Sequence, residues 1–134
     1  NIIMRSIILL LCVVGLSLQA IPCNIDVKLR SKTEKKFRVD LFVPSLKVKA
    51  DNIIFNKIDQ NKKINVQGDD CDGKLWLLQS FKLNEETHDW EQVGNVTTKF
   101  FGNGFVRFVF TDDLFPHLSD KTGVWSAEGN LFGG

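Results

Sequence analysis

The chain contains 134 residues, of which 43% are hydrophobic and 25% are charged, and its formal net charge at pH 7 is +1. This length suits a single domain, and the balance of apolar and charged residues excludes a globally disordered chain. The sequence also holds eleven Phe and three Trp but no Tyr, a composition that favours strands over helices.

The first twenty residues have the features of a secretory signal peptide. Met4-Arg5 precedes an apolar run of about ten residues, and a cleavage region ends at Ala20. Such a run is too short for a transmembrane helix, which needs about 20 apolar residues. We therefore expect residues 1–20 to be a signal peptide that truly starts at Met4 and is cleaved after Ala20. Residues 21–134 then form one secreted, extracellular domain with no transmembrane anchor; an uncleaved anchor is the alternative.

Cysteine usage agrees with an oxidising compartment. Cys12 lies in the predicted signal peptide, so the mature chain keeps only Cys23 and Cys71. Two cysteines in such a compartment have one intramolecular pairing, which predicts a Cys23–Cys71 disulfide. A reactive thiol is the less favoured alternative, because neither cysteine has an adjacent His and their number is even.

Alternation of apolar and polar residues marks most of the predicted strands, because period-two patterning places one face of a strand on a core. It is clearest from Ile25 to Arg30 and from Phe37 to Val43. The segment from Lys74 to Leu83 is apolar on both faces, which is typical of a central strand. In chain order, strands are expected at 25–30, 37–43, 52–58, 63–67, 74–83, 96–101 and 105–111; residues 90–93 restart the extended pattern, and residues 124–131 are a candidate for a last strand.

The strongest local signal is a hairpin in the C-terminal third of the chain. Segments 96–101 and 105–111 flank Gly102-Asn103-Gly104, and Asn-Gly suits the positive φ angles of a type I′ turn. Residues 114–120 are expected to form a short helical turn. Short strands with turns at roughly ten-residue spacing predict an all-β fold, an antiparallel β-sandwich of seven or eight strands; an open β-barrel is the alternative.

Charge is distributed unevenly along the chain. From Lys28 to Lys63 there are eleven Lys or Arg and four acidic residues, whereas the rest of the chain after Lys63 has five basic and eleven acidic residues. Lys28, Arg30 and Arg38 are candidates for an anion-binding face if their strands pair, and such a face attracts sulfated glycans or anionic lipid head groups. Two alternatives stay open: lysines that protect a solvated strand edge, and two halves that pair within one fold.

Two further motifs concern modification and metal binding. Asn95-Val96-Thr97 is an N-glycosylation sequon, and in a secreted chain it predicts a glycan on Asn95. Acidic loops hold Asp69, Asp70 and Asp72 and, further on, Asp112-Asp113. Calcium binding is one interpretation, but the spacing fits no calcium-loop pattern. We favour solvated turn acids and predict no metal site.

Catalysis is not expected. His88 and His117 are the only histidines, and both lie in polar segments. No nucleophile, base and orienting group stand out as a catalytic constellation. We therefore predict a protein that is not an enzyme and needs no cofactor, and secretion argues against a nucleic-acid partner.

The aromatic residues allow a second function. Phe42 and one face of the 105–110 strand exceed what one core face needs, and spare aromatic volume in a β-sandwich is able to line a lipid cavity. A packed core is the alternative, since each aromatic side chain buries on the order of 150–250 Å².

Five short segments carry a family resemblance: Ala20-Ile21-Pro22-Cys23, Val27-Lys28-Leu29, Lys36-Phe37-Arg38-Val39, the Asp-rich loop around Cys71, and Gly73-Lys74-Leu75-Trp76. Together they resemble the small secreted, surface-associated antigens of parasitic nematodes. The resemblance implies release outside the cell and exposure to a host, and it assigns no catalytic residues. We therefore expect a secreted, non-enzymatic binding module, a surface or excretory-secretory antigen that acts at the host interface on an extracellular protein, glycan or lipid. An extracellular lipid-binding carrier with an aromatic-lined cavity is the alternative.

Overall fold

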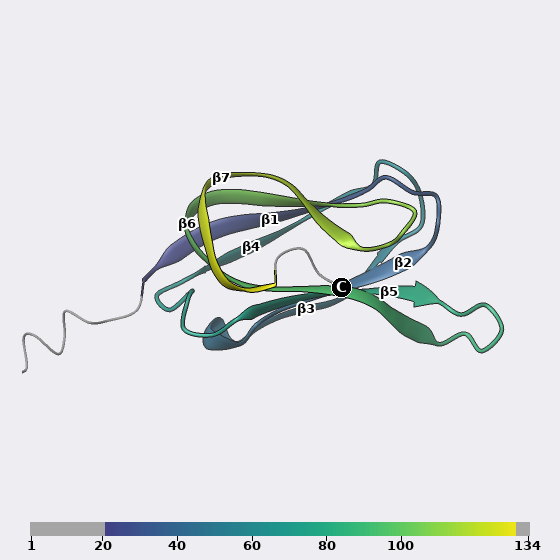
Figure 1. Ribbon diagram of the computed structural model, residues 1–134, viewed down its shortest axis with the longest axis horizontal. Coiled ribbons are helices and arrows are strands. Elements are labelled where there is room, and N and C mark those ends of the chain that lie inside the picture. Colours follow the sequence, from purple (N-terminus) through teal and green to yellow (C-terminus); the bar gives the residue numbers. More distant parts are fainter. Residues whose placement is uncertain (1–20, 131–134) are drawn as a thin grey trace, which may run out of the picture.

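The computed structural model describes residues 21–130; the predicted signal peptide, residues 1–20, lies outside the described residues, as do residues 131–134. The described part consists of strands and one short 3-10 turn, so the all-β class predicted from the sequence is confirmed (Figure 1). Its elements are β1 (Cys23–Ser31), β2 (Phe37–Val43), η1 (Pro44–Leu46), β3 (Val48–Phe55), β4 (Asn61–Gly68), β5 (Trp76–Leu83), β6 (Trp90–Phe110) and β7 (Pro116–Asn130).

All seven strands of the described residues belong to one hydrogen-bonded sheet. Its order is β3-β2-β5-β6-β1-β4, and β7 pairs with β6 outside this path. Figure 1 shows the sheet bent into two layers, with β7, β6, β1 and β4 in one and β5, β2 and β3 in the other. A single, nearly closed sheet fits the barrel alternative. The sequence predicted only antiparallel pairing, but β1, which lies between β6 and β4, runs parallel to β6.

The long strand β6 passes from one layer to the other without a turn, so the predicted hairpin at Gly102-Asn103-Gly104 is wrong. Its first half pairs with β5, and its second half pairs with β1 from Gly102 onward. Gly102 (φ 115°) and Gly104 (φ 157°) adopt backbone angles that side chains disfavour. The carbonyl oxygens of Gly123 and Thr122 on β7 occupy the space that a Cβ would need at these two positions. The glycines therefore form a bulge that turns the corner of the sheet.

The chain reverses after β6 rather than within it. The expected helical turn over residues 114–120 is wrong, because β7 begins at Pro116 and pairs with β6 from there. The reversal occurs just before β7, where the Leu114 N–H donates to the carbonyl of Thr111 at 2.9 Å and Leu114 takes φ 61°. The Asp113 carboxylate accepts a hydrogen bond from the backbone N–H two residues later at 2.9 Å, a contact by which Asp stabilises turns.

Aromatic side chains fill the space between the two layers. Phe37 stacks on Phe55 with 4.8 Å between ring centroids, and Phe110 lies 5.0 Å from Phe37. A second group places Trp76 edge-on to Phe100 at 5.2 Å. All five are 3% exposed or less. These rings contact one another, which is the packed-core alternative for the aromatic residues.

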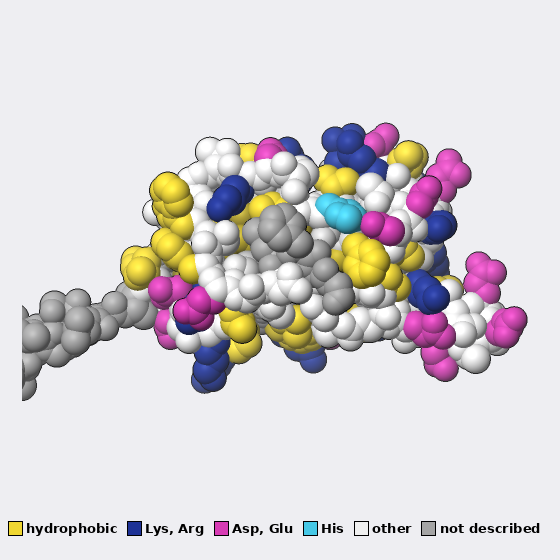
Figure 2. Space-filling view, in the orientation of Figure 1, with side chains coloured by type: hydrophobic (Ala, Val, Ile, Leu, Met, Phe, Trp, Pro, Cys, Tyr) yellow, Lys and Arg dark blue, Asp and Glu magenta, His cyan; other side chains and the backbone are white. Residues whose placement is uncertain are grey.

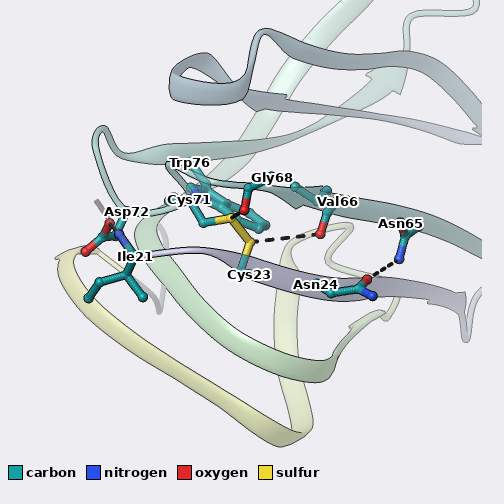
Figure 3. Close-up of a disulfide and its surroundings, with 9 residues drawn as sticks. All are labelled: Ile21, Cys23, Asn24, Asn65, Val66, Gly68, Cys71, Asp72 and Trp76. Atoms are coloured by element: carbon teal, nitrogen blue, oxygen red, sulfur yellow. Dashed lines mark hydrogen bonds between the residues drawn. A yellow bond between two sulfur atoms is a disulfide. The ribbon is translucent and has the colours of Figure 1, made fainter. Parts of the chain in front are cut away.

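The predicted disulfide joins the start of β1 to the loop between β4 and β5. Cys23 and Cys71 are bonded across a sequence separation of 48, with 5.8 Å between their Cα atoms. The backbone N–H of Cys71 donates to the carbonyl of Ile21 at 3.2 Å, and the Trp76 indole N–H donates to the Cys71 carbonyl at 2.7 Å. Figure 3 shows the indole beside the disulfide. The Asp-rich loop is therefore tied to both β1 and β5.

Removing the disulfide by the double substitution Cys23→Ala and Cys71→Ala is expected to lower the free energy of unfolding by about 4 kcal/mol. The reason is that closing a loop with a sequence separation of 48 restricts the unfolded chain. Urea denaturation of both proteins measures the difference. Equal unfolding midpoints would mean that the bond contributes nothing to stability.

Gly104→Ala is expected to lower the free energy of unfolding by at least about 2 kcal/mol, because the new Cβ meets the Thr122 carbonyl at a positive φ angle. Asn103→Ala is the matched control: the residue is exposed at the same corner and should change stability by less than about 0.5 kcal/mol. Urea titrations compare the two. Similar losses in both variants would contradict the role of the glycine.

Candidate anion-binding site

Strand β1 presents Lys28 on the outer face of its layer. Its neighbours Val27 and Leu29 are each 1% exposed, so strand alternation turns Lys28 away from the core. In the register of the sheet, Lys28 lies opposite Lys63 on β4 and opposite Arg107 on β6. Because adjacent strands are about 4.8 Å apart, these three cations form a row across three strands.

A shallow hollow of about 270 Å³ lies along this row. We call it the basic hollow; its lining residues are Lys28, Leu29, Asn61, Lys62, Lys63 and Arg107. Four of the six carry a positive charge and none carries a negative one. Since like charges gathered in a concave surface raise the local positive potential, the hollow favours an anion.

The Phe105 ring makes cation–π contacts with two of these cations, Lys28 and Arg107. It lies on β6 two residues before Arg107, and the Nζ atom of Lys28 stands 4.2 Å from its ring centroid. The guanidinium carbon of Arg107 lies 5.3 Å from the same centroid, and Arg107 Nη1 also donates to both carboxylate oxygens of Asp120 at 3.0 and 3.1 Å. Cation–π and ionic contacts restrict these side chains, so part of the hollow is held in place before a ligand binds.

The structure separates the three residues proposed from the sequence. Lys28 and Arg30 share the outer face of β1, and Arg30 Nη2 donates to Asp59 at 2.9 Å. Arg38 does not join them, because β2 pairs with β3 and β5 rather than with β1. Its side chain is 18% exposed and binds Asp40 at 3.0 Å in the other layer.

Lys63 and Arg107 were not predicted from the sequence as partners of Lys28. Both belong to segments predicted as strands, and alternation would place each on an outer face. The neighbours of β1 are decided by pairing between residues 31 or more positions apart in the sequence, and alternation carries no information about that pairing.

The ion pairs among the described residues do not connect the basic segment, Lys28 to Lys63, with the acidic part of the chain that follows it. Each one joins two residues from the same part of the chain, such as Arg30 with Asp59 in the basic segment and Arg107 with Asp120 in the acidic part. The alternative in which the two halves pair within the fold therefore gains no support from ion pairs. Cations such as Lys63 remain available to an external anion.

Acidic side chains gather elsewhere on the molecule. Figure 2 shows a group of them on the turn between β5 and β6, which projects from one end of the domain and contains Glu85, Glu86 and Asp89. A larger hollow of about 650 Å³ has mixed charge; its charged lining residues are Lys35, Lys36, Lys82, Glu85, Asp112 and Asp113. This second hollow has no preference for one sign of charge, in contrast to the basic hollow.

The Asp112–Asp113 loop uses its carboxylates within the fold. Asp112 accepts a hydrogen bond from the Thr33 hydroxyl at 2.6 Å, and Asp113 contacts His117 Nε2 at 2.7 Å. Among the described residues, no three His, Cys, Asp or Glu side chains form a group suited to a metal ion. The Thr111 hydroxyl donates to Asp113 rather than to His117, so this cluster lacks the nucleophile–base contact of covalent catalysis.

No known protein family matches this chain, and no curated protein matches it. Among residues 21–130, no helix is long and apolar enough to cross a membrane. A function must therefore be argued from the chemistry of the site itself.

The Asp113 cluster predicts a pH-dependent contribution to stability. Partial burial raises the pKa of Asp113, but hydrogen bonds from Phe115 N–H, His117 and Thr111 outweigh it, so the pKa lies below 3.8. A carboxyl with a lowered pKa stabilises the fold above the unfolded value, and this contribution is lost as the pH falls through the folded pKa. Asp113→Ala should therefore cost up to about 1 kcal/mol at pH 7.

The cost of Asp113→Ala should shrink as the pH drops below 3.8. Thermal unfolding followed by circular dichroism across acidic and neutral pH measures it. Asp89→Ala, a change in the exposed β5–β6 turn, is the control and should show no such trend. A cost that is the same at every pH would contradict the assignment.

Proposed function

We propose that this protein is a secreted, non-enzymatic binding module that holds a sulfated glycan in its basic hollow. The observation that carries the proposal is the gathering of Lys28, Lys62, Lys63 and Arg107 around one hollow with no acidic residue in its lining. The disulfide supports an extracellular site of action. With the resemblance to nematode surface antigens, it supports a role at the interface with a host.

The shape and charge of the hollow favour a chain with repeated negative groups over a small enclosed ligand. The hollow is shallow, and Lys63, Lys28 and Arg107 lie in a row across β4, β1 and β6. A sulfated glycan offers one anionic group after another along such a row. Each sulfate that replaces a counterion at a lysine or arginine adds binding energy that weakens with salt.

Charge reversal at the centre of the hollow tests the function. Lys28→Glu with Lys63→Glu should weaken binding to an immobilised sulfated glycan by about tenfold or more at physiological ionic strength, because two attractive contacts become repulsive. Elution from the glycan column in a salt gradient, followed by titration calorimetry, measures the loss.

A second double variant controls for net charge. Lys49→Glu with Lys74→Glu changes the total charge equally, and these exposed lysines do not line the basic hollow. It should elute close to the unaltered protein. Equal losses of glycan binding in both double variants would mean that only the overall charge matters. If the unaltered protein binds vesicles rich in phosphatidylserine but not the glycan, the ligand is a lipid head group instead.

A further inference from the structure

Asn95 lies in the first half of β6, on the outer face of the layer opposite to the basic hollow. It pairs with Gln79 on β5, and Gln79 pairs with Asp40 on β2. The side chain is half-buried, whereas its neighbours Gly94 and Val96 are buried. The sequon therefore belongs to a strand, and its asparagine points away from the core.

Within residues 21–130, β6 is paired along one edge only at this residue. Strand β7 pairs with β6 only from Thr97 onward, and β1 pairs from Gly102 onward. Among the described residues, Asn95 consequently has a neighbouring strand on one side only, which is β5. A bulky group attached to Asn95 is able to extend over the sheet face without displacing a strand of residues 21–130.

The face around Asn95 carries apolar side chains on both sides of a polar row formed by Asp40, Gln79 and Asn95. Four half-buried side chains flank this row, and we call them the outer apolar strip: Phe42, Leu77, Phe81 and Trp90. Phe42 pairs with Leu77 in the register of β2 and β5. The guanidinium carbon of Arg38 lies 4.2 Å from the Phe81 ring centroid and 5.6 Å from that of Trp90, so the two rings belong to one face.

An outward sheet face is ordinarily polar, and part of this strip is already covered, because Arg38 lies over Phe81 and Lys49 lies over Phe42. Leu77 and Phe81 lie on β5 at the two positions that flank Gln79, which faces Asn95. In an antiparallel pair, such diagonal neighbours are about 7–8 Å apart. Any sugar attached to Asn95 therefore begins within reach of the strip.

We propose that Asn95 carries an N-linked glycan whose first sugars lie over the outer apolar strip. In the attachment step, the amide nitrogen of Asn95 bonds to C1 of an N-acetylglucosamine carried on a lipid pyrophosphate. The bond from C1 to the pyrophosphate oxygen breaks, the lipid pyrophosphate leaves, and the amide nitrogen loses one proton.

The placement has a structural consequence that is independent of the basic hollow. Sugar rings present C–H faces that pack on aromatic and aliphatic side chains, and their hydroxyl groups face water. The glycan thus gives the strip a polar cover. It leaves the outer face of β4, β1 and the second half of β6 open, where Lys28 lies.

Secretion of the full chain from a eukaryotic host tests attachment. The intact mass should fall by the mass of a glycan after treatment with peptide N-glycosidase, and peptide mapping should find Asp at position 95. Asn95→Gln should be secreted without the glycan, whereas Thr97→Ser, which keeps the sequon, should retain it. Unmodified Asn95 in the secreted protein would overturn the proposal.

Enzymatic removal of the glycan from the folded protein tests the packing, and it does not depend on whether a variant folds. Binding of a hydrophobic fluorescent dye should rise severalfold after removal, and the thermal midpoint should fall. Leu77→Ser should reduce that rise, whereas Ile58→Ser, a change at a 49% exposed residue in the β3–β4 turn, should not. If dye binding does not change when the glycan is removed, the glycan does not pack on the outer apolar strip.

Retention on the sulfated glycan column separates this proposal from the proposed function. Asn95→Gln and the enzymatically treated protein should elute as the glycosylated protein does, since the modified face and the basic hollow lie on different layers.

Discussion

The absence of a Cβ at Gly102 and Gly104 is the constraint on which the arrangement of the sheet depends. Carbonyl oxygens of Thr122 and Gly123 fill the space where these side chains would lie, so β6 and β7 bend together at this point. The bend lets one strand pair with β5 in one layer and with β1 in the other. It also brings Arg107, beyond the corner, beside Lys28. A side chain at the bulge would disturb the layers and the basic hollow together.

The two outer faces of the bent sheet differ in chemistry. On the layer of β4, β1 and β6, charged side chains face water and leave a hollow lined by four cations. On the layer of β2, β5 and the first half of β6, half-buried apolar side chains flank the polar row that contains Asn95. The face with the basic hollow therefore suits an external anion, and the face around Asn95 suits the glycan proposed above. This division follows from which residues each strand turns outward.

Local patterns predicted the elements better than their partners. Alternation from Ile25 to Arg30 located β1, because a strand with one buried face repeats every two residues in any sheet. The same pattern could not place β1 between β4 and β6, and so it grouped Lys28 with Arg38 instead of with Lys63. The Gly102-Asn103-Gly104 segment was misread for a related reason. Glycine and asparagine favour positive φ angles in turns and in bulges alike, and the choice between them was made by contacts with a strand further along the chain.

The disulfide between Cys23 and Cys71 closes a segment of the chain that includes several strands. Strands β1 to β4 all lie between the two cysteines, and so does most of the basic hollow. A protease that cuts the exposed turn around Lys57 would produce two fragments that stay joined through sulfur. Each fragment would also remain hydrogen-bonded within the sheet. A single cut at this turn would thus leave Lys28 and Lys63 in one molecule and in register.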